Sequence, residues 1–527
     1  MSGERAVKMD KGSINKKDSF LIRILNRIER LGNRLPHPIT IFFMLSVGIV
    51  LISEICARAG VSATGEMIDT ATLTLKEQTI FAVSLLNKEG LVYMLTHLVS
   101  NFTGFAPLGV VLVTMLGVGF AEGSGYMTAL MKKGVSVTPA AIVTPGLVFL
   151  GVMSNVATDI GYVVLVPLGA MIFANYGRHP LAGLAAVFSG VSGGYSANLI
   201  IGTLEPMLAG ISTEAASMIN PDYVVEPTAN LYFMMVSTLV IVLLGTLVTD
   251  KVVEPRLQKS EPQVANYKEA AALSPREKKA LLYANATLVG LVATVVALAL
   301  PKNSFLRNPQ TGSLVNGSPL INGIIGLITL AFFLPSLVYG RISGSIPNEK
   351  AVCEQLGKNM SAMGSYIALS FVASQFINYF NYTKLGTILA LKGAELLGES
   401  QLNGIVLMML FIFFSATLNL VMGSASAKWT ILAPVFVPMF MLLGYSPELT
   451  QVAYRIGDSC TNLITPLMSY FAMIVVAAQK YKKDSGVGTL IAMMLPYSVC
   501  FLIGWSLLLG VWMLFNLPLG PGVQMYL

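Results

Sequence analysis

Three short polar clusters interrupt the apolar stretches of this 527-residue chain, and they contain the residues best suited to chemistry. An ionised side chain in surroundings as apolar as a lipid bilayer costs several kcal/mol unless it is paired or hydrated. Charges in these clusters are therefore expected to bind an ion, a proton or a solute. The clusters are residues 154–159 (SNVATD), 423–429 (GSASAKW) and 455–462 (RIGDSCTN).

The first cluster contains Asp159, the only carboxylate between Glu122 and Glu205. A lone carboxylate could bind a cation or a proton, or accept a hydrogen bond from a substrate amine. The alternative is an aspartate that caps a half-helix at a hairpin turn. We expect Asp159 to bind substrate and cation, with Asn155 as a further cation ligand.

The second cluster combines small residues with one large aromatic side chain. Small residues around Ser426 let a ligand approach the backbone closely, and Trp429 could stack on an aromatic ring. The alternative places Trp429 at a helix interface or near lipid headgroups. Lys428 is expected to extend its ammonium to water. We expect Ser426 and Trp429 to contact the substrate.

In the third cluster, Arg455 and Asp458 are three positions apart, which places them on one face of a helix. The guanidinium can grip a carboxylate with two hydrogen bonds, and oxygens of Asp458 and Asn462 suit a hard cation. Pro466 indicates a break in the helix just beyond them. The alternative is an Arg–Asp pair that only neutralises itself inside the core. We expect Arg455, Asp458 and Pro466 to belong to a substrate site.

A related segment without charge, residues 189–198, offers hydroxyls, carbonyls and Asn198 as further cation ligands. The three histidines, His37, His97 and His179, lie near expected interfaces or hairpin turns, so we interpret them as structural. The four cysteines lack the spacing of a metal site. No cofactor is expected, and no metal beyond a sodium ion.

The elements that must carry these clusters are membrane helices. Hydrophobic residues make up 54% of the chain, charged residues 12%, and the mean hydropathy is +0.70. Soluble domains average about 25% charged residues, so the composition indicates an integral membrane protein. The apolar stretches lack the alternation of outer-membrane strands, which favours an all-α architecture. The net charge of +7 comes mostly from Lys and Arg in short loops, where they set topology, and this argues against nucleic-acid binding.

The distribution of positive charge predicts about nine transmembrane helices and two re-entrant hairpins, with the N-terminus inside and the C-terminus outside. Irregular backbone at membrane depth is tolerated only inside protein or beside water, so the broken apolar stretches are interpreted as hairpins. The expected parts are a cytoplasmic N-terminal amphipathic segment (1–38), a first half (39–250) with hairpin one (138–176), a cytoplasmic loop (251–280), linking spans (281–340) and a second half (341–527) with hairpin two (402–443).

The two broken stretches are related by an offset of 267 positions, at which several glycines and prolines coincide. Single matches mean little because both residues are common here, but their common offset carries weight. The first hairpin is expected to enter from inside and the second from outside. Such an inverted repeat, with broken helices in corresponding positions, is typical of secondary transporters. The matched landmarks are Gly119 with Gly386, Pro167 with Pro434, Gly177 with Gly444, and Pro180 with Pro447.

Taken together, these clusters resemble the aminobenzoyl-glutamate transporter (AbgT) family over nearly the whole chain. The resemblance is carried by residues 154–162, 423–429 and 454–459 with Asn462 and Pro466. It implies a homodimer in a bacterial cytoplasmic membrane with nine spans and two hairpins in each chain. It also implies transport of p-aminobenzoyl-glutamate, a folate breakdown product, driven by a gradient of Na⁺ or H⁺, and in some members export of sulfonamides.

The resemblance implies a role in substrate binding for Asp159, Ser426, Trp429, Arg455, Asp458 and Pro466. Asn419, just before the tip of hairpin two, is similar to a polar position of the family and is added to the cation ligands. Together with the ligands expected from residue type, the cation-binding residues are Asn155, Asp159, Asn198, Asn419, Asp458 and Asn462.

Three other functions compete with this interpretation. A related carrier for another carboxylate, such as a C4-dicarboxylate, would use the same charges, although Trp429 favours an aromatic ligand. A channel would need a continuous pore rather than two different hairpins. An intramembrane hydrolase would need a base beside its serine, and no histidine is expected near Ser426. We therefore expect a transporter and not an enzyme.

Overall fold

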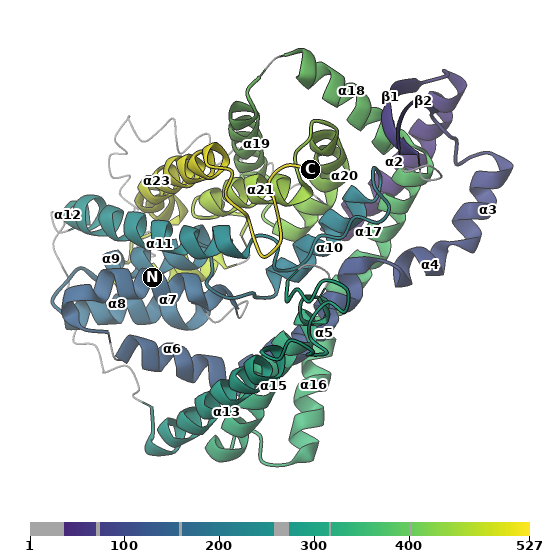
Figure 1. Cartoon of the computed structure of the whole chain (residues 1–527). Helices are drawn as coiled ribbons and strands as arrows, with labels where there is room; N and C mark the ends of the chain where they lie inside the picture. Colours follow the sequence, from purple (N-terminus) through teal and green to yellow (C-terminus); the bar gives the residue numbers. More distant parts are fainter. Residues whose placement is uncertain are drawn as a thin grey trace, which may run out of the picture.

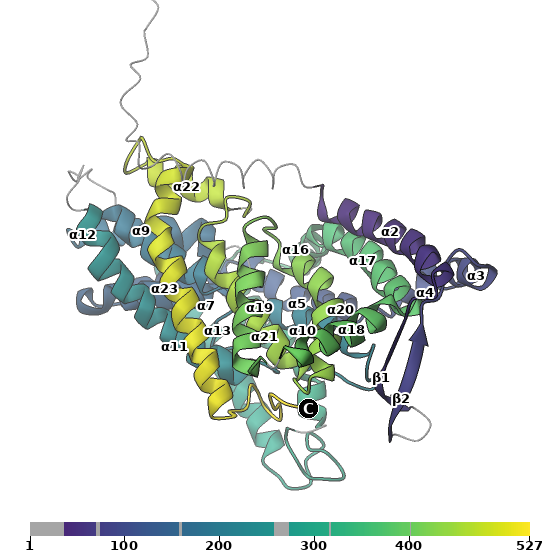
Figure 2. The same cartoon turned by 90° about the horizontal axis from the view of Figure 1, so that it is seen from above.

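The computed structural model describes residues 36–69, 74–136, 138–156, 161–257, 273–315, 318–400, 402–468 and 470–527. Most of the N-terminal segment predicted over 1–38 therefore lies outside the described residues, as does Asp159. The described chain is built mainly from helices, seen from two directions in Figures 1 and 2. A helical membrane architecture is confirmed.

The first apolar stretch forms one helix, and the polar segment after it forms a small β-hairpin rather than a loop. The strands pair antiparallel from Ser62 opposite Phe81 to Asp69 opposite Thr74, and Thr64 and Thr79 share a hydrogen bond of 2.8 Å across them. This sheet is a departure from the all-α expectation. The elements are α2 (Pro38–Arg58), β1 (Ser62–Asp69), β2 (Thr74–Phe81), α3 (Lys88–Thr96), α4 (Leu98–Thr103), α5 (Ala106–Gly123) and α6 (Tyr126–Ser136).

Hairpin one is a pair of short helices separated by a break, as its prolines and polar residues predict. Its second arm, α8, packs along the following helix, α9. The elements are η1 (Ala140–Ile142), α7 (Val143–Met153), η2 (Ser154–Val156), η3 (Gly161–Leu165), α8 (Val166–Asn175), α9 (Pro180–Phe188), η4 (Ser189–Gly193) and α10 (Leu204–Ala216).

Long helices connect the two halves. Two of them, α13 (Pro275–Ala299) and α15 (Ile324–Ser343), form an arm with α5 that projects from the rest of the molecule (Figure 1). Helical structure continues from α11 to Leu257 and resumes at Pro275, where Ser274 and Glu277 form a capping box. The elements are α11 (Leu231–Val248), η5 (Thr249–Val253), α12 (Glu254–Leu257), α13 (Pro275–Ala299), α14 (Pro319–Asn322) and α15 (Ile324–Ser343).

The second half repeats the pattern of broken helices. Hairpin two consists of α19 and α20, which are joined by the break at residues 420–424. The elements are α16 (Glu349–Ala362), α17 (Gly364–Tyr382), α18 (Leu385–Glu399), α19 (Gly404–Asn419), α20 (Ala425–Leu442), α21 (Pro447–Asn462), α22 (Phe471–Gln479) and α23 (Val487–Leu514).

By length and apolar composition, seven described helices can span a membrane, or eight if a pair bent by 42°, α16 and α17, forms one span. This count takes in only long apolar helices, whereas the predicted nine spans and two hairpins also draw on stretches that polar residues break into shorter helices, such as 180–204 and 446–479. The shorter apolar helices are Val143–Val156, Gly161–Asn175, Pro180–Gly193 and Gly404–Asn419.

The ends of the two hairpins show the internal repeat directly. Gly177 and Gly444 both adopt the left-handed conformation, with φ of +70° and +84°, which glycine alone adopts at little cost. Each closes the C-terminus of its hairpin helix with the same backbone hydrogen bond. These bonds run from Arg178 N to Phe173 O (2.8 Å) and from Tyr445 N to Phe440 O (2.9 Å).

The next helix in each half begins in the same way. Pro180 and Pro447 occupy the first turn of α9 and α21, where the missing N–H costs nothing. The preceding residues, His179 and Ser446, accept hydrogen bonds from backbone N–H groups of these helices. Because all these features keep the offset of 267 positions predicted from the sequence, the repeat is confirmed.

The largest hydrophobic core lies where the two halves meet. It includes Val148 and Phe188 from the first half and Phe440 and Trp505 from the second, all nearly inaccessible to solvent. Gly190 and Gly457 let helices of each half approach closely, since a Cβ at either position would lie under 3.0 Å from neighbouring backbone. This packing brings α19, α20 and α21 together around the polar clusters.

Candidate functional site

Hairpin two and α21 together enclose a buried pair of opposite charges. The ammonium of Lys428 forms an ion pair with the carboxylate of Asp458 and donates a hydrogen bond to Oδ1 of Asn419. Both charged side chains are only 1% exposed. The expectation that Lys428 extends to water is therefore wrong, because the tip of hairpin two turns into the protein and not toward a membrane surface.

Asn419 connects hairpin two to the end of α21. Its Nδ2 lies 2.7 Å from the carbonyl oxygen of Asp458, 2.9 Å from Oγ1 of Thr461 and 2.8 Å from Oδ1 of Asn462. Three residues named as cation ligands from the sequence, Asn419, Asp458 and Asn462, thus lie together. Side-chain oxygens of two of them, Asn419 and Asp458, contact the Lys428 ammonium, so a positive charge of the protein already lies between them.

Arg455 has a different partner from the one its spacing suggested. Its Nη2 donates to Oε1 of Glu205 at 2.6 Å and to the carbonyl of Ser196 at 3.3 Å. The second oxygen of Glu205 accepts from the backbone N–H of Gly202 at 2.6 Å. Arg455 and Asp458 each have a separate partner of opposite charge, so the alternative of a self-neutralising Arg455–Asp458 pair is not what the structure contains.

The guanidinium of Arg455 keeps unused hydrogen-bonding capacity. Among the described residues, its buried Nε and Nη1 have no hydrogen-bond partner. A buried donor left unpaired is costly, by about 1–3 kcal/mol. Arg455 therefore has two free donors with which it could bind a further oxygen group.

Trp429 lies inside the protein and not on a cavity wall. Its ring is 0% exposed and stacks on Tyr454 with centroids 4.6 Å apart and planes 25° apart. Its Nε1 donates to Oγ of Ser212 at 3.0 Å, and the hydroxyl of Tyr454 lies 3.4 Å from Oδ1 of Asp458. In this conformation Trp429 is a helix-interface residue whose position depends on both halves.

A chain of buried polar side chains extends from Trp429 toward the loop before α11. Ser212 donates to Gln451 at 2.7 Å, and Gln451 donates to Asn230 at 2.9 Å. Asn230 in turn donates to the carbonyl of Glu448 at 3.2 Å, and Tyr223 donates to its carboxylate at 3.0 Å. No local sequence pattern indicates this hydrogen-bond network, because its bonds join residues more than 200 positions apart.

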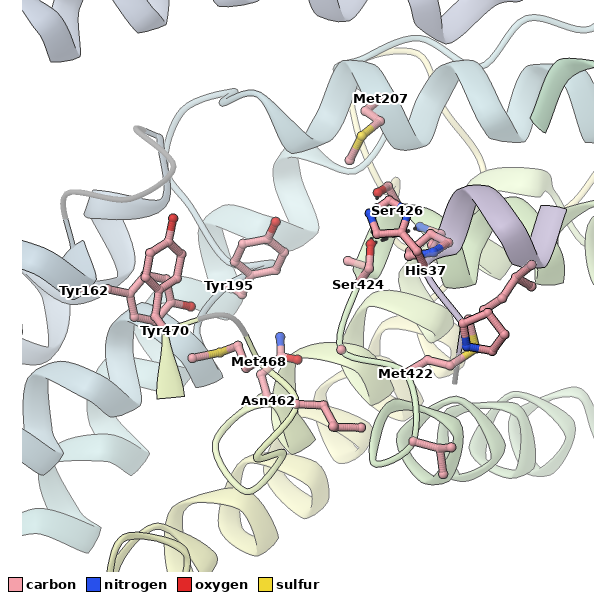
Figure 3. Close-up of a pocket in the computed structure, with 18 residues that line it drawn as sticks. His37, Tyr162, Tyr195, Met207, Met422, Ser424, Ser426, Asn462, Met468 and Tyr470 are labelled. Atoms are coloured by element: carbon pink, nitrogen blue, oxygen red, sulfur yellow. Dashed lines mark hydrogen bonds between the residues drawn. The ribbon is translucent and has the colours of Figure 1, made fainter. Parts of the chain in front are cut away.

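Beside the buried charges lies a cavity of about 560 Å³, open between the two halves. Figure 3 shows Tyr162, Tyr195 and Tyr470 on one side and Ser424 and Ser426 on the other. Pockets for small ligands usually enclose about 300–1,000 Å³. The cavity is thus large enough for a small organic solute. Asn462 also lines it, whereas Trp429, Arg455 and Asp458 do not.

Hairpin one contributes neutral groups near this cavity. Asn155 donates to the carbonyl of Gly194 at 3.3 Å, and Oδ1 of Asn198 accepts from the backbone N–H of Leu199 at 2.9 Å. Within the described residues, the buried Oδ1 of Asn155 and Oγ of Ser196 have no hydrogen-bond partner. These oxygens are therefore available to a ligand such as a cation.

The remaining predicted site residue, Pro466, lies in the irregular segment between α21 and α22. The next two residues, Leu467 and Met468, line the cavity. The carbonyl of Leu467 also packs against Gly423 at the tip of hairpin two, where a Cβ would have to lie 2.7 Å from it. The proline thus sits where the broken helix passes the hairpin tip.

Two residues of the site escaped the sequence analysis. Glu205 is 250 positions from Arg455, and nothing in either local pattern links them. The Lys428 ammonium was expected to extend to water, so its ion pair with Asp458 was not predicted. The signal that could have found both is charge balance, since a buried Arg455 and a buried Asp458 each require a partner of opposite sign.

Fold and site define a class of protein: a multi-pass membrane transporter whose paired broken-helix hairpins converge on buried charges. The chain belongs to the AbgT transporter family, whose profile matches residues 23–527. The family and the relatives below are transporters, so the protein is a transporter and not an enzyme.

Similar proteins cover almost the whole chain. The p-aminobenzoyl-glutamate transport protein of Escherichia coli K12 is 37% identical over 496 residues, covering 94% of this chain and 96% of that protein. The crystal structure of the YdaH transporter of Alcanivorax borkumensis is 45% identical with a TM-score of 0.87, covering 92% of this chain and all of that one. The structure of Neisseria gonorrhoeae MtrF, described with a class of antimetabolite efflux pumps, is 48% identical with a TM-score of 0.88, covering 95% of this chain and all of that one.

Proposed function

We propose that this protein is a secondary transporter of p-aminobenzoyl-glutamate, driven by a gradient of Na⁺ or H⁺. The observation that carries the proposal is Arg455, a buried cation with two unpaired donors that also bonds the carbonyl of Ser196, the neighbour of Tyr195 on the cavity wall. The relative of known transport activity in Escherichia coli supports the same substrate.

The substrate matches the cavity in two respects. Its aminobenzoyl ring suits the wall of Tyr162, Tyr195 and Tyr470, since aromatic rings stack or meet edge to face. Its carboxylates suit Arg455, which bonds the carbonyl of Ser196 beside Tyr195 of the wall, and the hydroxyl of Ser426 on the opposite wall. A C4-dicarboxylate lacks the ring and would make no stacking contact with this wall.

The other proposed site residues act around these contacts. Asp159, Trp429 and Asp458 belong to the elements that must move when the cavity opens to the other side, and Pro466 marks the break that lets α21 and α22 move separately. Asn155 and Asn198 are proposed ligands of the coupling cation, because the first half has buried oxygens without partners.

Export of sulfonamides is the second candidate function. The observation that favours it is the similarity to MtrF at 48% identity. A sulfonamide shares the aniline ring of aminobenzoyl-glutamate but lacks its dicarboxylate. It would therefore use the tyrosine wall without Arg455.

The proposal includes the setting of the protein. We infer a homodimer in a bacterial cytoplasmic membrane, with the N-terminus inside and the C-terminus outside. We expect the surface of α13 to contact a partner chain or lipid, because only 11% of its most apolar window is buried within the chain.

Substrate identity is tested with purified protein in liposomes and labelled p-aminobenzoyl-glutamate. Unlabelled aminobenzoyl-glutamate is expected to compete strongly, a sulfonamide more weakly, and succinate or glutamate hardly at all. Competition by succinate as strong as by the substrate itself would support the C4-dicarboxylate carrier instead.

A further inference from the structure

Lys428 occupies a place at which a transporter of this construction could otherwise hold a mobile cation. The side chain enters from the first turns of α20, and its ammonium contacts the carboxylate of Asp458 and the amide oxygen of Asn419. We propose that this ammonium is a tethered cation that permanently fills a cation site in hairpin two. The proposal rests on ion-coupled transport as the proposed function.

The surroundings of the ammonium have the chemistry of a cation site. The ammonium contacts a carboxylate oxygen of Asp458 and the amide oxygen of Asn419, while the Nδ2 of Asn419 is held by the Asp458 carbonyl and the Thr461 hydroxyl. Oxygen donors of these kinds are the ligands that hard cations take in proteins. They come from the broken end of α19 and from the end of α21, and in transporters such interrupted helices commonly hold coupling ions.

The internal repeat provides a comparison site that lacks the tether. At the offset of 267 positions, Gly161 corresponds to Lys428 and Val191 corresponds to Asp458. These two residues also lie against each other, since a Cβ on Gly161 would lie 2.8 Å from Cγ1 of Val191. The same pair of positions is therefore in contact in both halves, charged in one and apolar in the other.

The two halves differ accordingly in what they can still bind. In the second half the ammonium already occupies the oxygens of Asp458 and Asn419, and one neighbouring buried oxygen, Oγ of Ser459, has no partner among the described residues. In the first half, among the described residues, Oδ1 of Asn155 and Oγ of Ser196 are buried without partners. We infer that the mobile coupling ion belongs to the first half, while Lys428 supplies the positive charge of the second.

The proposal predicts how a variant that lacks the Lys428 ammonium responds to Na⁺. Lys428→Ala leaves the buried carboxylate of Asp458 without a counter-charge and opens space beside it. A small cation such as Na⁺ is then expected to enter the vacated position. Because a ligand stabilises the state that binds it, Na⁺ should protect this variant against unfolding more than it protects the wild type.

The experiment measures thermal unfolding of the full-length protein in detergent, in NaCl and in choline chloride of equal ionic strength. We expect Lys428→Ala to be less stable than the wild type in choline, and its melting temperature to rise with Na⁺ by about 2–4 °C more than that of the wild type. Lys428→Arg keeps the charge and should respond to Na⁺ as the wild type does.

A second variant keeps the test decisive if Lys428→Ala is too unstable to purify. Lys428→Gln retains a hydrogen-bond donor for Asp458 but removes the charge, and it should show the same additional Na⁺ response. In Lys428→Gln with Asp458→Asn the carboxylate is also neutral, and the additional response should disappear. Equal Na⁺ responses in the wild type and both single neutral variants would overturn the proposal.

The readout separates this proposal from the proposed function. Unfolding in detergent requires no transport, so the Na⁺ response of the variants can be measured whether or not a gradient drives uptake. Conversely, suppose that the wild type shows gradient-driven uptake but the variants do not differ from it in their Na⁺ response. That result would leave the transport proposal intact and refute the tethered cation.

Discussion

The two hairpins share a backbone design and differ in charge. Both end in a left-handed glycine and are followed by a helix that begins with proline. Hairpin two, however, encloses the Lys428–Asp458 pair, where hairpin one has Gly161 and Val191. The difference indicates that the repeat supplies the geometry of the site, while substitutions in one copy divide the chemistry between the halves.

The largest expected effect is a difference in stability loss between substitutions at Asp458, in the charged copy of the repeat, and at Val191, the equivalent position of the apolar copy. Asp458→Asn leaves the Lys428 ammonium buried without a negative partner, and breaking a buried ion pair in this way costs about 3–5 kcal/mol. Val191→Thr at the equivalent position introduces only a hydroxyl and should cost about 1–3 kcal/mol. Thermal unfolding of both variants in detergent measures the difference. Equal losses of stability would mean that the charge pair has no special role.

The second prediction concerns Arg455 and Glu205. Replacing both by alanine removes the pair without leaving either charge alone, so the protein should still fold. Hydrogen bonds to charged groups contribute about 1.5–3 kcal/mol, so uptake of p-aminobenzoyl-glutamate should fall roughly 10- to 100-fold. Sulfonamide transport, which lacks the dicarboxylate, should fall much less. A liposome assay with both compounds provides the test, and equal loss for the two would count against Arg455 as the carboxylate partner.

A smaller effect is expected where Trp429 is held. Ser212→Ala removes the acceptor of the Trp429 N–H and the donor to Gln451, at a cost of about 1–3 kcal/mol. The control in hairpin one is Ser154→Ala, whose hydroxyl donates to the carbonyl of Gly151 three residues earlier and to no other group in the described part of the chain. Ser212→Ala alone should also shift the tryptophan emission. An unchanged spectrum with unchanged stability would rule out this role of Ser212.

The smallest effects should be equal in the two copies. Gly177→Ala and Gly444→Ala each force a side chain into the left-handed conformation, which costs about 1–2 kcal/mol. Neither position has atoms within 4 Å of the added Cβ, so no clash should differ between them. Matched shifts of the unfolding midpoint would support the repeat, and a large difference between them would contradict it.

The sequence predicted the architecture because membrane insertion and backbone breaks leave local signals. Proline and glycine at a common offset located both hairpins, since these residues restrict or free the backbone wherever they occur. The β-hairpin of β1 and β2 was missed because the apolar stretches that indicate an all-α architecture carry no information about the polar segment between them.

The site was only partly predictable, because its partners come from distant segments. Asp458 and Asn462 were predicted from residue type and Asn419 from the family resemblance, and the three do lie together. The pairing of Arg455 with Glu205 and the stacking of Trp429 on Tyr454 depend on tertiary packing that no local pattern encodes. Lys428 was misplaced because a lysine near a helix end usually extends to water, and only the inward turn of the hairpin tip prevents it.

Ion-driven transport is the central claim, and uptake of labelled p-aminobenzoyl-glutamate into liposomes tests it most directly. Gradients of Na⁺ and of H⁺ are imposed separately, with empty liposomes as the control. We predict that one of the two gradients drives labelled substrate to an internal concentration above the external one, and that an ionophore that collapses this gradient abolishes the accumulation. Uptake that stops at equal concentrations under every gradient would contradict the claim.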